Sequence, residues 1–140
     1  MVAEIEQKRR IRAAGVGEPP ERTWSNCLVV KDQVFIAGMT ARGDEFDDVP
    51  GGSAYEQAVV IFRKIQALME AAGGCMDDVV KVIIYVTDIE ERDEVWTARR
   101  EFFSGDFPVS TLIEISKLAR PEMKVEIEAM AVLGASGRRV

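Results

Sequence analysis

Histidine is absent from the 140 residues of the sequence, and this absence excludes several kinds of active site. Ser-His-Asp and Cys-His catalysis, HExxH zinc sites and imidazole general bases all require this residue. Cysteine is nearly absent too, since only Cys27 and Cys75 occur, and the chain therefore holds too few ligands for a closed structural zinc site. We expect no metal and no cofactor, and a chemistry based on carboxylates, hydroxyls, backbone groups or an ordered water.

The sequence also lacks a basic stripe and a long apolar run. Acidic residues number 24 against 18 basic ones, giving a net charge of −6, whereas phosphate binding requires clustered positive charge. No apolar run approaches the roughly 20 residues that span a bilayer, and the first residues form no continuous hydrophobic signal region. We therefore expect a cytoplasmic, reducing location with free thiols, and neither nucleic acid nor membrane as a partner.

The composition that is present is typical of a globular protein. Hydrophobic residues make up 47% of the chain and charged residues 30%, a balance that suits one folded domain of this length. We interpret residues 1–140 as a single domain in which residues 1–22 form an N-terminal arm. Residues 2–13 are compatible with a short charged helix. Residues 38–52, rich in glycine and acids, are interpreted as a polar surface loop or a lid.

Hydrophobic periodicity and turn residues predict the remaining elements. The clearest is a helix that starts at the N-cap Ser53, with Glu56 in the capping-box position. The full set comprises strands at 26–30 and 33–37 around the turn Lys31-Asp32, a helix from 53 to the Gly73-Gly74 pair, a strand at 79–86, a helix at 92–103, and strands at 111–116 and 125–131. The order β-β-α-β-α-β-β predicts an α+β fold in which both helices cover one face of a sheet.

The last two predicted strands carry apolar residues on the side that faces away from the helices. Leu112 and Met130 alternate there with glutamates. Such residues favour a partner sheet from another copy, and the alternative is a monomer whose mixed face is solvated. The residues alone leave both interpretations open.

An ordered set of short segments resembles the Rid family, also called YjgF or L-PSP (endoribonuclease-like) proteins. The segments are Glu56-Gln57, residues 65–72, Gly73-Gly74, 77–81, 85–88, Phe102-Phe103, Phe107-Pro108 and 125–131, and the resemblance covers about residues 24–132. These proteins are deaminases of reactive imines and enamines. The resemblance therefore implies a chorismate-mutase-like fold, a homotrimer with a cleft at each subunit interface, and a small-molecule ligand.

The same resemblance implies a set of site residues. Glu126 corresponds to the glutamate that helps to position the attacking water, which makes it the candidate catalytic residue, although alternating glutamates on a strand are otherwise a solvated face. The implied substrate-binding positions are Trp24 (a tyrosine in the family), Gly38, Trp96 (often an asparagine), Ser110, Thr111 and Leu112. The two tryptophans either line a pocket for a flat neutral or cationic ligand or fill the interface as core.

Ser110 is the main departure from the family pattern. Active Rid deaminases carry an arginine two residues after the proline of this segment, where it binds the substrate carboxylate. Ser110 occupies that position after Pro108, and a hydroxyl offers one donor and no charge. An anionic imino acid is therefore disfavoured in the cleft unless Arg99 or Arg100 reaches it from the second predicted helix.

Three functions follow from this pattern. The first is hydrolysis of a small imine or enamine that lacks the usual carboxylate, with Glu126 orienting the water. The second is a non-catalytic trimeric protein that binds or senses a small molecule. The third is the ribonuclease activity attached to the family name, which the lack of histidine and of a basic stripe disfavours.

Overall fold

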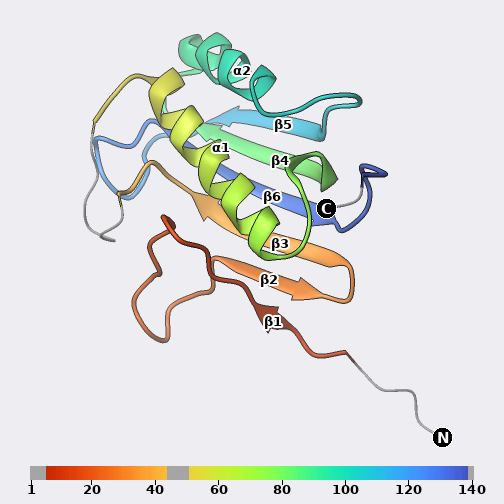
Figure 1. Cartoon of the computed structure of the whole chain (residues 1–140). Helices are drawn as coiled ribbons and strands as arrows, with labels where there is room; N and C mark the ends of the chain where they lie inside the picture. Colours follow the sequence, from red (N-terminus) through yellow and green to blue (C-terminus); the bar gives the residue numbers. More distant parts are fainter. Residues whose placement is uncertain (1–5, 44–50, 139–140) are drawn as a thin grey trace, which may run out of the picture.

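The computed structural model describes residues 6–43 and 51–138, and its centre is one mixed β-sheet (Figure 1). The sheet has six strands in the order β1-β2-β3-β6-β4-β5, and every neighbouring pair is antiparallel except the parallel pair β4–β5. The elements are β1 (Arg9–Arg10), β2 (Cys27–Val30), β3 (Gln33–Met39), α1 (Ala54–Ala71), β4 (Val79–Val86), α2 (Arg92–Arg100), β5 (Val109–Glu114) and β6 (Val125–Val132). This arrangement confirms the predicted α+β class and the order of its main elements.

Two local sequence signals produce the structure that they predict. Lys31 and Asp32 form the turn between β2 and β3, and Lys31 takes a left-handed φ of 56°. Ser53 caps α1 with its side-chain oxygen, which accepts from the backbone N–H of Glu56 at 3.1 Å. The Glu56 carboxylate accepts in return from the Ser53 N–H at 3.2 Å, so both halves of the capping box are present.

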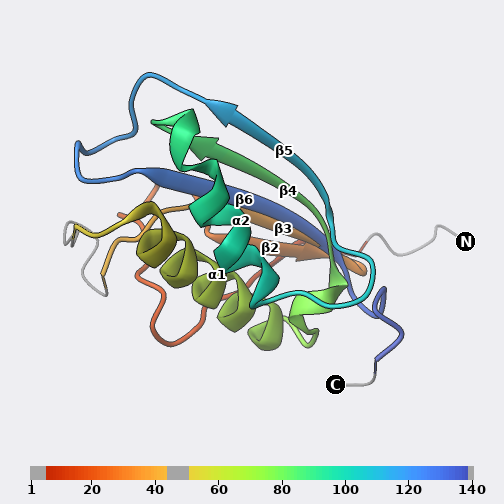
Figure 2. The ribbon, with the colours of Figure 1, turned by 90° about the horizontal axis from the view of Figure 1, so that it is seen from above.

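Both helices lie on the same side of the sheet (Figure 2). Between helices and sheet lies one buried core, to which α1 contributes Ile65 and Leu68 and β4 contributes Val82 and Ile84. Phe62 extends this core toward the chain that follows α2, where its ring lies 5.5 Å from that of Phe102 and 5.8 Å from that of Phe103. Within the described ranges no helix combines the length and apolarity needed to cross a bilayer.

No helix of the described residues covers the opposite side of the sheet, which we call the open face. Met130 is 41% exposed there, as predicted, but the prediction for Leu112 is wrong. The β4–β5 register places Leu112 beside the buried Ile84, on the helix side. Val109 and Ile113 are the exposed apolar residues of β5 on the open face, at 66% and 42%. Residues on the two faces of this strand alternate, and the more apolar set faces away from the core of its own chain. The hydrophobic alternation of the sequence therefore predicts the wrong face for each set.

The N-terminal region is the second correction. Residues 1–5 lie outside the described ranges, and the predicted helix over 2–13 is wrong for the rest because Arg9 and Arg10 form β1 against Val29 and Leu28. Ile11 continues this pairing by donating its N–H to the Cys27 carbonyl at 3.0 Å. The free edge of β2 offers backbone partners that a charged, weakly amphipathic segment takes up instead of helix.

The other boundaries move by only a few residues. Helix α2 ends at Arg100 rather than at 103, and β5 begins at Val109 rather than at 111. The loop predicted over 38–52 begins two residues later than predicted, because β3 continues to Met39, and its residues 44–50 are outside the described ranges.

Candidate functional site

The candidate site residues fall into two groups that lie apart on the sheet. Glu126 of β6 lies opposite Tyr85 of β4, whereas Ser110 of β5 lies opposite Val82 of the same strand. This register separates them by about 10 Å along the strands and about 10 Å across the sheet, and it puts them on opposite faces. We call the group around Glu126 the glutamate half-site and the group around Ser110 the serine half-site. A single chain does not bring the two half-sites together.

Gly38 and Glu126 form the centre of the glutamate half-site. A Cβ atom added to Gly38 would lie 2.7 Å from Cδ of Glu126 and 2.8 Å from its Oε2, distances that real Cβ atoms do not show. Only glycine therefore allows the carboxyl group to lie against β3 in this position. The position of the Glu126 carboxyl group therefore depends on the lack of a side chain at Gly38 of the neighbouring strand.

The environment of Glu126 favours its protonated form. Burial raises the pKa of this carboxyl group, the nearby Glu128 raises it further, and Arg42 lowers it by a smaller amount. Tyr85 does not relieve the burial, because its hydroxyl donates to Glu128 at 2.6 Å. A raised pKa makes a carboxylate a better proton acceptor than an ordinary glutamate, which favours its use in general acid–base catalysis.

Trp24 and Arg42 complete this half-site. Both line a small cavity of about 40 Å³ together with Gly38. Trp24 is 46% exposed, so it is not part of the core of its own chain and forms one wall of this cavity. Arg42 was not among the sequence candidates. It lies in the loop after β3, where no spacing pattern connects it to Glu126.

The serine half-site is built where α2 runs along β5 on the helix side of the sheet. Arg99 donates from Nη1 to the Ser110 hydroxyl oxygen at 2.9 Å, and in the turn just before the helix the Ile89 N–H donates to Oε1 of Glu114 at 3.0 Å. These two contacts fix the helix antiparallel to the strand. Leu112 lies between them on β5 and packs against the core.

Trp96 and Arg99 are the residues that α2 contributes to this half-site. Trp96 is half-buried, and the guanidinium of Arg92 lies 5.9 Å from its ring centroid, within the range of a cation–π contact. Of the two arginines that the sequence offered, Arg99 is the one that reaches Ser110. Burial and the neighbouring Arg100 lower the pKa of its guanidinium. Thr111 lies apart from these residues, exposed on the open face opposite Ile83.

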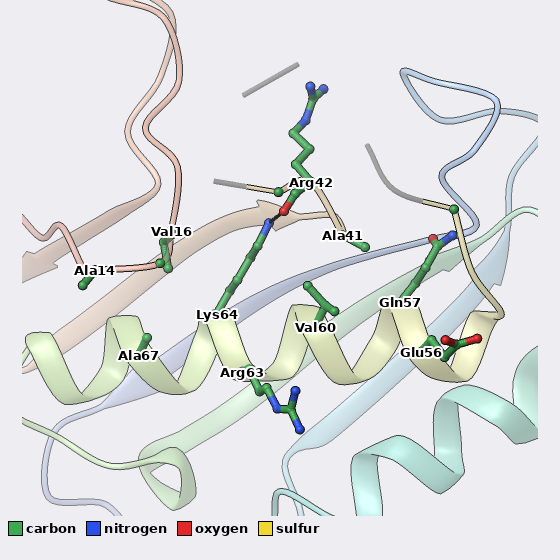
Figure 3. A pocket seen from close by; sticks show the side chains of 13 residues that line it. Ala14, Val16, Ala41, Arg42, Glu56, Gln57, Val60, Arg63, Lys64 and Ala67 are labelled. Atoms are coloured by element: carbon green, nitrogen blue, oxygen red, sulfur yellow. Dashed lines mark hydrogen bonds between the residues drawn. The ribbon is translucent and has the colours of Figure 1, made fainter. Parts of the chain in front are cut away.

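A larger cavity, of about 560 Å³, lies against α1 and contains none of the candidate residues. Figure 3 shows that Arg42 and Arg63 extend their guanidinium groups in opposite directions, away from the space between them. Lys64 turns its ammonium group toward the chain and donates to the Thr40 and Arg42 carbonyls, the first at 2.8 Å. The other described residues of this wall are aliphatic or glycine except Glu56, whose carboxylate accepts from the Ser53 N–H, and Gln57, whose amide is bonded to the backbone at 122 and 124. The described part of the wall therefore presents no set of polar groups that converges on a ligand, as binding sites require.

Comparisons with known proteins agree with this architecture. A crystal structure of a protein of unknown function from Pseudomonas aeruginosa matches with a TM-score of 0.82 and 42% identity, over 92% of this chain and 94% of that chain. RidA from an Antarctic Psychrobacter bacterium matches with a TM-score of 0.80 and 26% identity, over 89% of this chain and 99% of that chain. A 2-iminobutanoate/2-iminopropanoate deaminase of Dermatophagoides farinae is 26% identical over 125 residues, which are 89% of this chain and 97% of the relative.

The family model described as Endoribonuclease L-PSP matches residues 17–133, which include both half-sites. The matched range also contains the segments on which the resemblance to Rid proteins was based, and the sheet with two helices on one side agrees with the fold implied there. The chain therefore belongs to the Endoribonuclease L-PSP family, to which the Rid proteins belong.

Proposed function

We propose that the protein hydrolyses a small imine or enamine in a cleft formed where copies of the chain meet, with Glu126 as the proton-transfer group. The observation that carries this proposal is the position of the Glu126 carboxyl group against Gly38, where burial raises its pKa. Relatives that cover most of the chain are named 2-iminobutanoate/2-iminopropanoate deaminases, which supports the reaction class.

The reaction needs one group that takes a proton and later returns it. As the water oxygen bonds to the imine carbon, the carbon–nitrogen π bond breaks, the ionised Glu126 accepts a proton from the water, and the protonated carboxyl group gives this proton to the nitrogen. Glu126 then takes the proton of the new hydroxyl group and passes it to the nitrogen while the carbonyl bond forms and the carbon–nitrogen single bond breaks, so that the products are ammonia and a carbonyl compound. An enamine enters the same sequence after a proton has moved from its nitrogen to its carbon. The raised pKa of Glu126 suits both steps.

A homotrimer is the assembly we propose for this site. Phe35, Ile113 and Met130 are between 38% and 42% exposed on the open face of one chain, which favours cover by another copy. The separation of the two half-sites on one chain is a second support, since a closed ring of copies would place the glutamate half-site of one beside the serine half-site of the next. Light scattering should then give three times the 15.5 kDa of one chain.

Ser110 sets the expected substrate range. Its hydroxyl carries no charge, so we do not expect residue 110 to hold the carboxylate of a 2-imino acid as the arginine of active relatives would. The natural substrate is then an imine or enamine other than the standard 2-imino acids, or one whose charge is bound by another residue.

Ammonia release from imines generated in the assay tests the proposal. The wild-type protein should release ammonia faster than buffer from at least one neutral or anionic imine. The Glu126→Gln variant should lose about 100-fold of this rate or more, while Glu70→Gln, at an exposed position of α1, should keep it. A wild-type rate equal to buffer for every imine would overturn the proposal and would favour a non-catalytic binding protein.

A further inference from the structure

Two buried polar side chains of helix α1 contact the main chain on either side of the glutamate half-site. The first is Gln57, whose amide donates to the Glu122 carbonyl at 2.8 Å and accepts from the Lys124 N–H at 2.8 Å. These bonds fix the chain just before β6, a short distance ahead of Glu126. One side of the half-site is therefore attached to α1 through its main chain.

Lys64 makes the corresponding contact on the other side. It lies about two helical turns after Gln57, so both side chains leave α1 on the same face. Its ammonium group donates to the Thr40 carbonyl at 2.8 Å and to the Arg42 carbonyl (Figure 3). The last paired residue of β3 is Met39, so these two carbonyls lie just beyond the ladder of the sheet, and Lys64 binds them there.

The segment that Lys64 binds carries two features of the glutamate half-site. Gly38, at the irregular end of β3, leaves the space that the Glu126 carboxyl group occupies. Arg42 lines the small cavity together with Gly38 and Lys64. Burial and Glu128 raise the pKa of Glu126, and the charge of Arg42 lowers it. The position of this segment therefore affects both the space and the charge around Glu126.

The burial of Lys64 has an energetic cost that an apolar residue would avoid. Removal of an ammonium group from water is unfavourable, and hydrogen bonds offset only part of the cost. The residues of α1 around Lys64 that face the core, such as Ile61, Ile65 and Leu68, are all apolar. What Lys64 gains is a pair of charge-assisted hydrogen bonds, which are stronger than those of a neutral donor. The residue is therefore better suited to holding the segment after β3 than to filling the core.

We propose that Lys64 is a positioning residue of the glutamate half-site, which binds two main-chain carbonyls after β3 and thereby keeps Arg42 close to Glu126. Two other groups face the same carboxyl group: Glu128 of β6 opposes the effect of Arg42, and Tyr85 of β4 donates its hydroxyl to Glu128. Loss of the Lys64 ammonium should release Arg42 and make Glu126 bind its proton more tightly. This inference rests on the proposed function in one respect, since Glu126 is the proton-transfer group there.

The pKa of Glu126 in solution tests the inference without turnover. Carbon-13 NMR of the side-chain carboxyl groups measures it, and the Glu126 signal is identified by its loss in Glu126→Gln. We expect Lys64→Met to raise this pKa, as Arg42→Gln should. If Lys64 acts through Arg42, the two effects do not add, so in the Arg42→Gln background Lys64→Met should raise the pKa by less than about half as much as in the wild type.

Arg63→Met is the matched control, because it removes the same charge one residue earlier on α1. Arg63 is exposed, and Figure 3 shows its guanidinium extending away from that of Arg42. The pKa of Glu126 should stay at its wild-type value in this variant. The inference is overturned by no rise in Lys64→Met or by an equal rise in Arg63→Met. A rise in the Arg42→Gln background of about half or more of that in the wild type also overturns it, since the charge of Lys64 would then act directly.

A second variant keeps the test valid if Lys64→Met does not fold. Lys64→Gln removes the same charge but keeps an N–H donor on a side chain that is one bond shorter and cannot reach both carbonyls. It should give the same pattern in the two backgrounds with a smaller rise, and the same outcomes would overturn the inference. An inactive protein that shows this pattern refutes the proposed function alone. An active protein without the pattern refutes the positioning role of Lys64 alone.

Discussion

The two half-sites differ in how the fold positions their charged group. In the glutamate half-site the carboxyl group of Glu126 occupies space that is open only because Gly38 on the neighbouring strand has no side chain. In the serine half-site the guanidinium of Arg99 is delivered by a long side chain from a helix to a strand. The first arrangement depends on two backbones in a fixed register and the second on one flexible side chain. We therefore expect substitutions in the two half-sites to change different kinetic constants, and by different amounts.

Adding one methyl group to the glutamate half-site should give the largest effect. In Gly38→Ala the new Cβ would meet Cδ of Glu126 at 2.7 Å, so the carboxyl group must move, and a displacement of about 1 Å costs about 100-fold in rate. We expect this loss in kcat for ammonia release. Gly51→Ala is the matched control, since a Cβ there meets nothing within 4 Å. Wild-type kcat in Gly38→Ala would show that the carboxyl position does not matter.

Removing the charge of the serine half-site should have a smaller effect of a different kind. For an imine with a carboxylate, Arg99→Gln should raise KM about tenfold, because a charge-assisted hydrogen bond to the bound substrate is lost. The kcat should stay near the wild-type value, and KM for a neutral imine should not change. Steady-state kinetics with the two imine classes measures both. An equal rise in KM for charged and neutral imines would show that Arg99 does not bind the charge of the substrate.

The smallest expected effect is on stability. Folding raises the pKa of Glu126 above 4.5, the ordinary value of a glutamate, so the native state binds the proton more tightly than the unfolded chain. The contribution of this group to the free energy of unfolding is then fully present below pH 4 and lost as the pH rises through the native pKa. Glu126→Gln should have a higher Tm than the wild type at pH 7.5, and the difference should shrink at pH 4.

A lower Tm of the Glu126→Gln variant at pH 7.5 would contradict the upward direction of the pKa shift of Glu126. The exposed Glu70→Gln controls for the change in net charge.

The sequence predicts the scaffold well where the signal is local. The capping box of Ser53 and Glu56 and the turn at Lys31 and Asp32 involve residues close in the chain, and both form as predicted. Residues 2–13 contain no such signal, and what forms there depends on the distant edge of β2.

The candidate site was less predictable because it depends on contacts between distant residues. The sequence predicts the wrong face for Leu112 because the more apolar of the two alternating sets of residues in β5 faces away from the core of its own chain. The sequence offered Arg99 and Arg100 equally, and only the rotation of α2 against β5 selects Arg99. Arg42 gave no signal at all, since its link to Glu126 is spatial.

The central claim is that one active site takes its glutamate half-site from one copy of the chain and its serine half-site from another. Mixing two inactive variants tests it most directly. Glu126→Gln removes the proton-transfer group, and Ser110→Phe blocks the other half-site with a bulky ring. After dissociation and joint reassembly at equal amounts, we predict about a quarter of the wild-type rate of ammonia release, because random assembly pairs two intact half-sites from different copies that often. A mixture no more active than the mean of the two variants would show that both half-sites must come from the same chain.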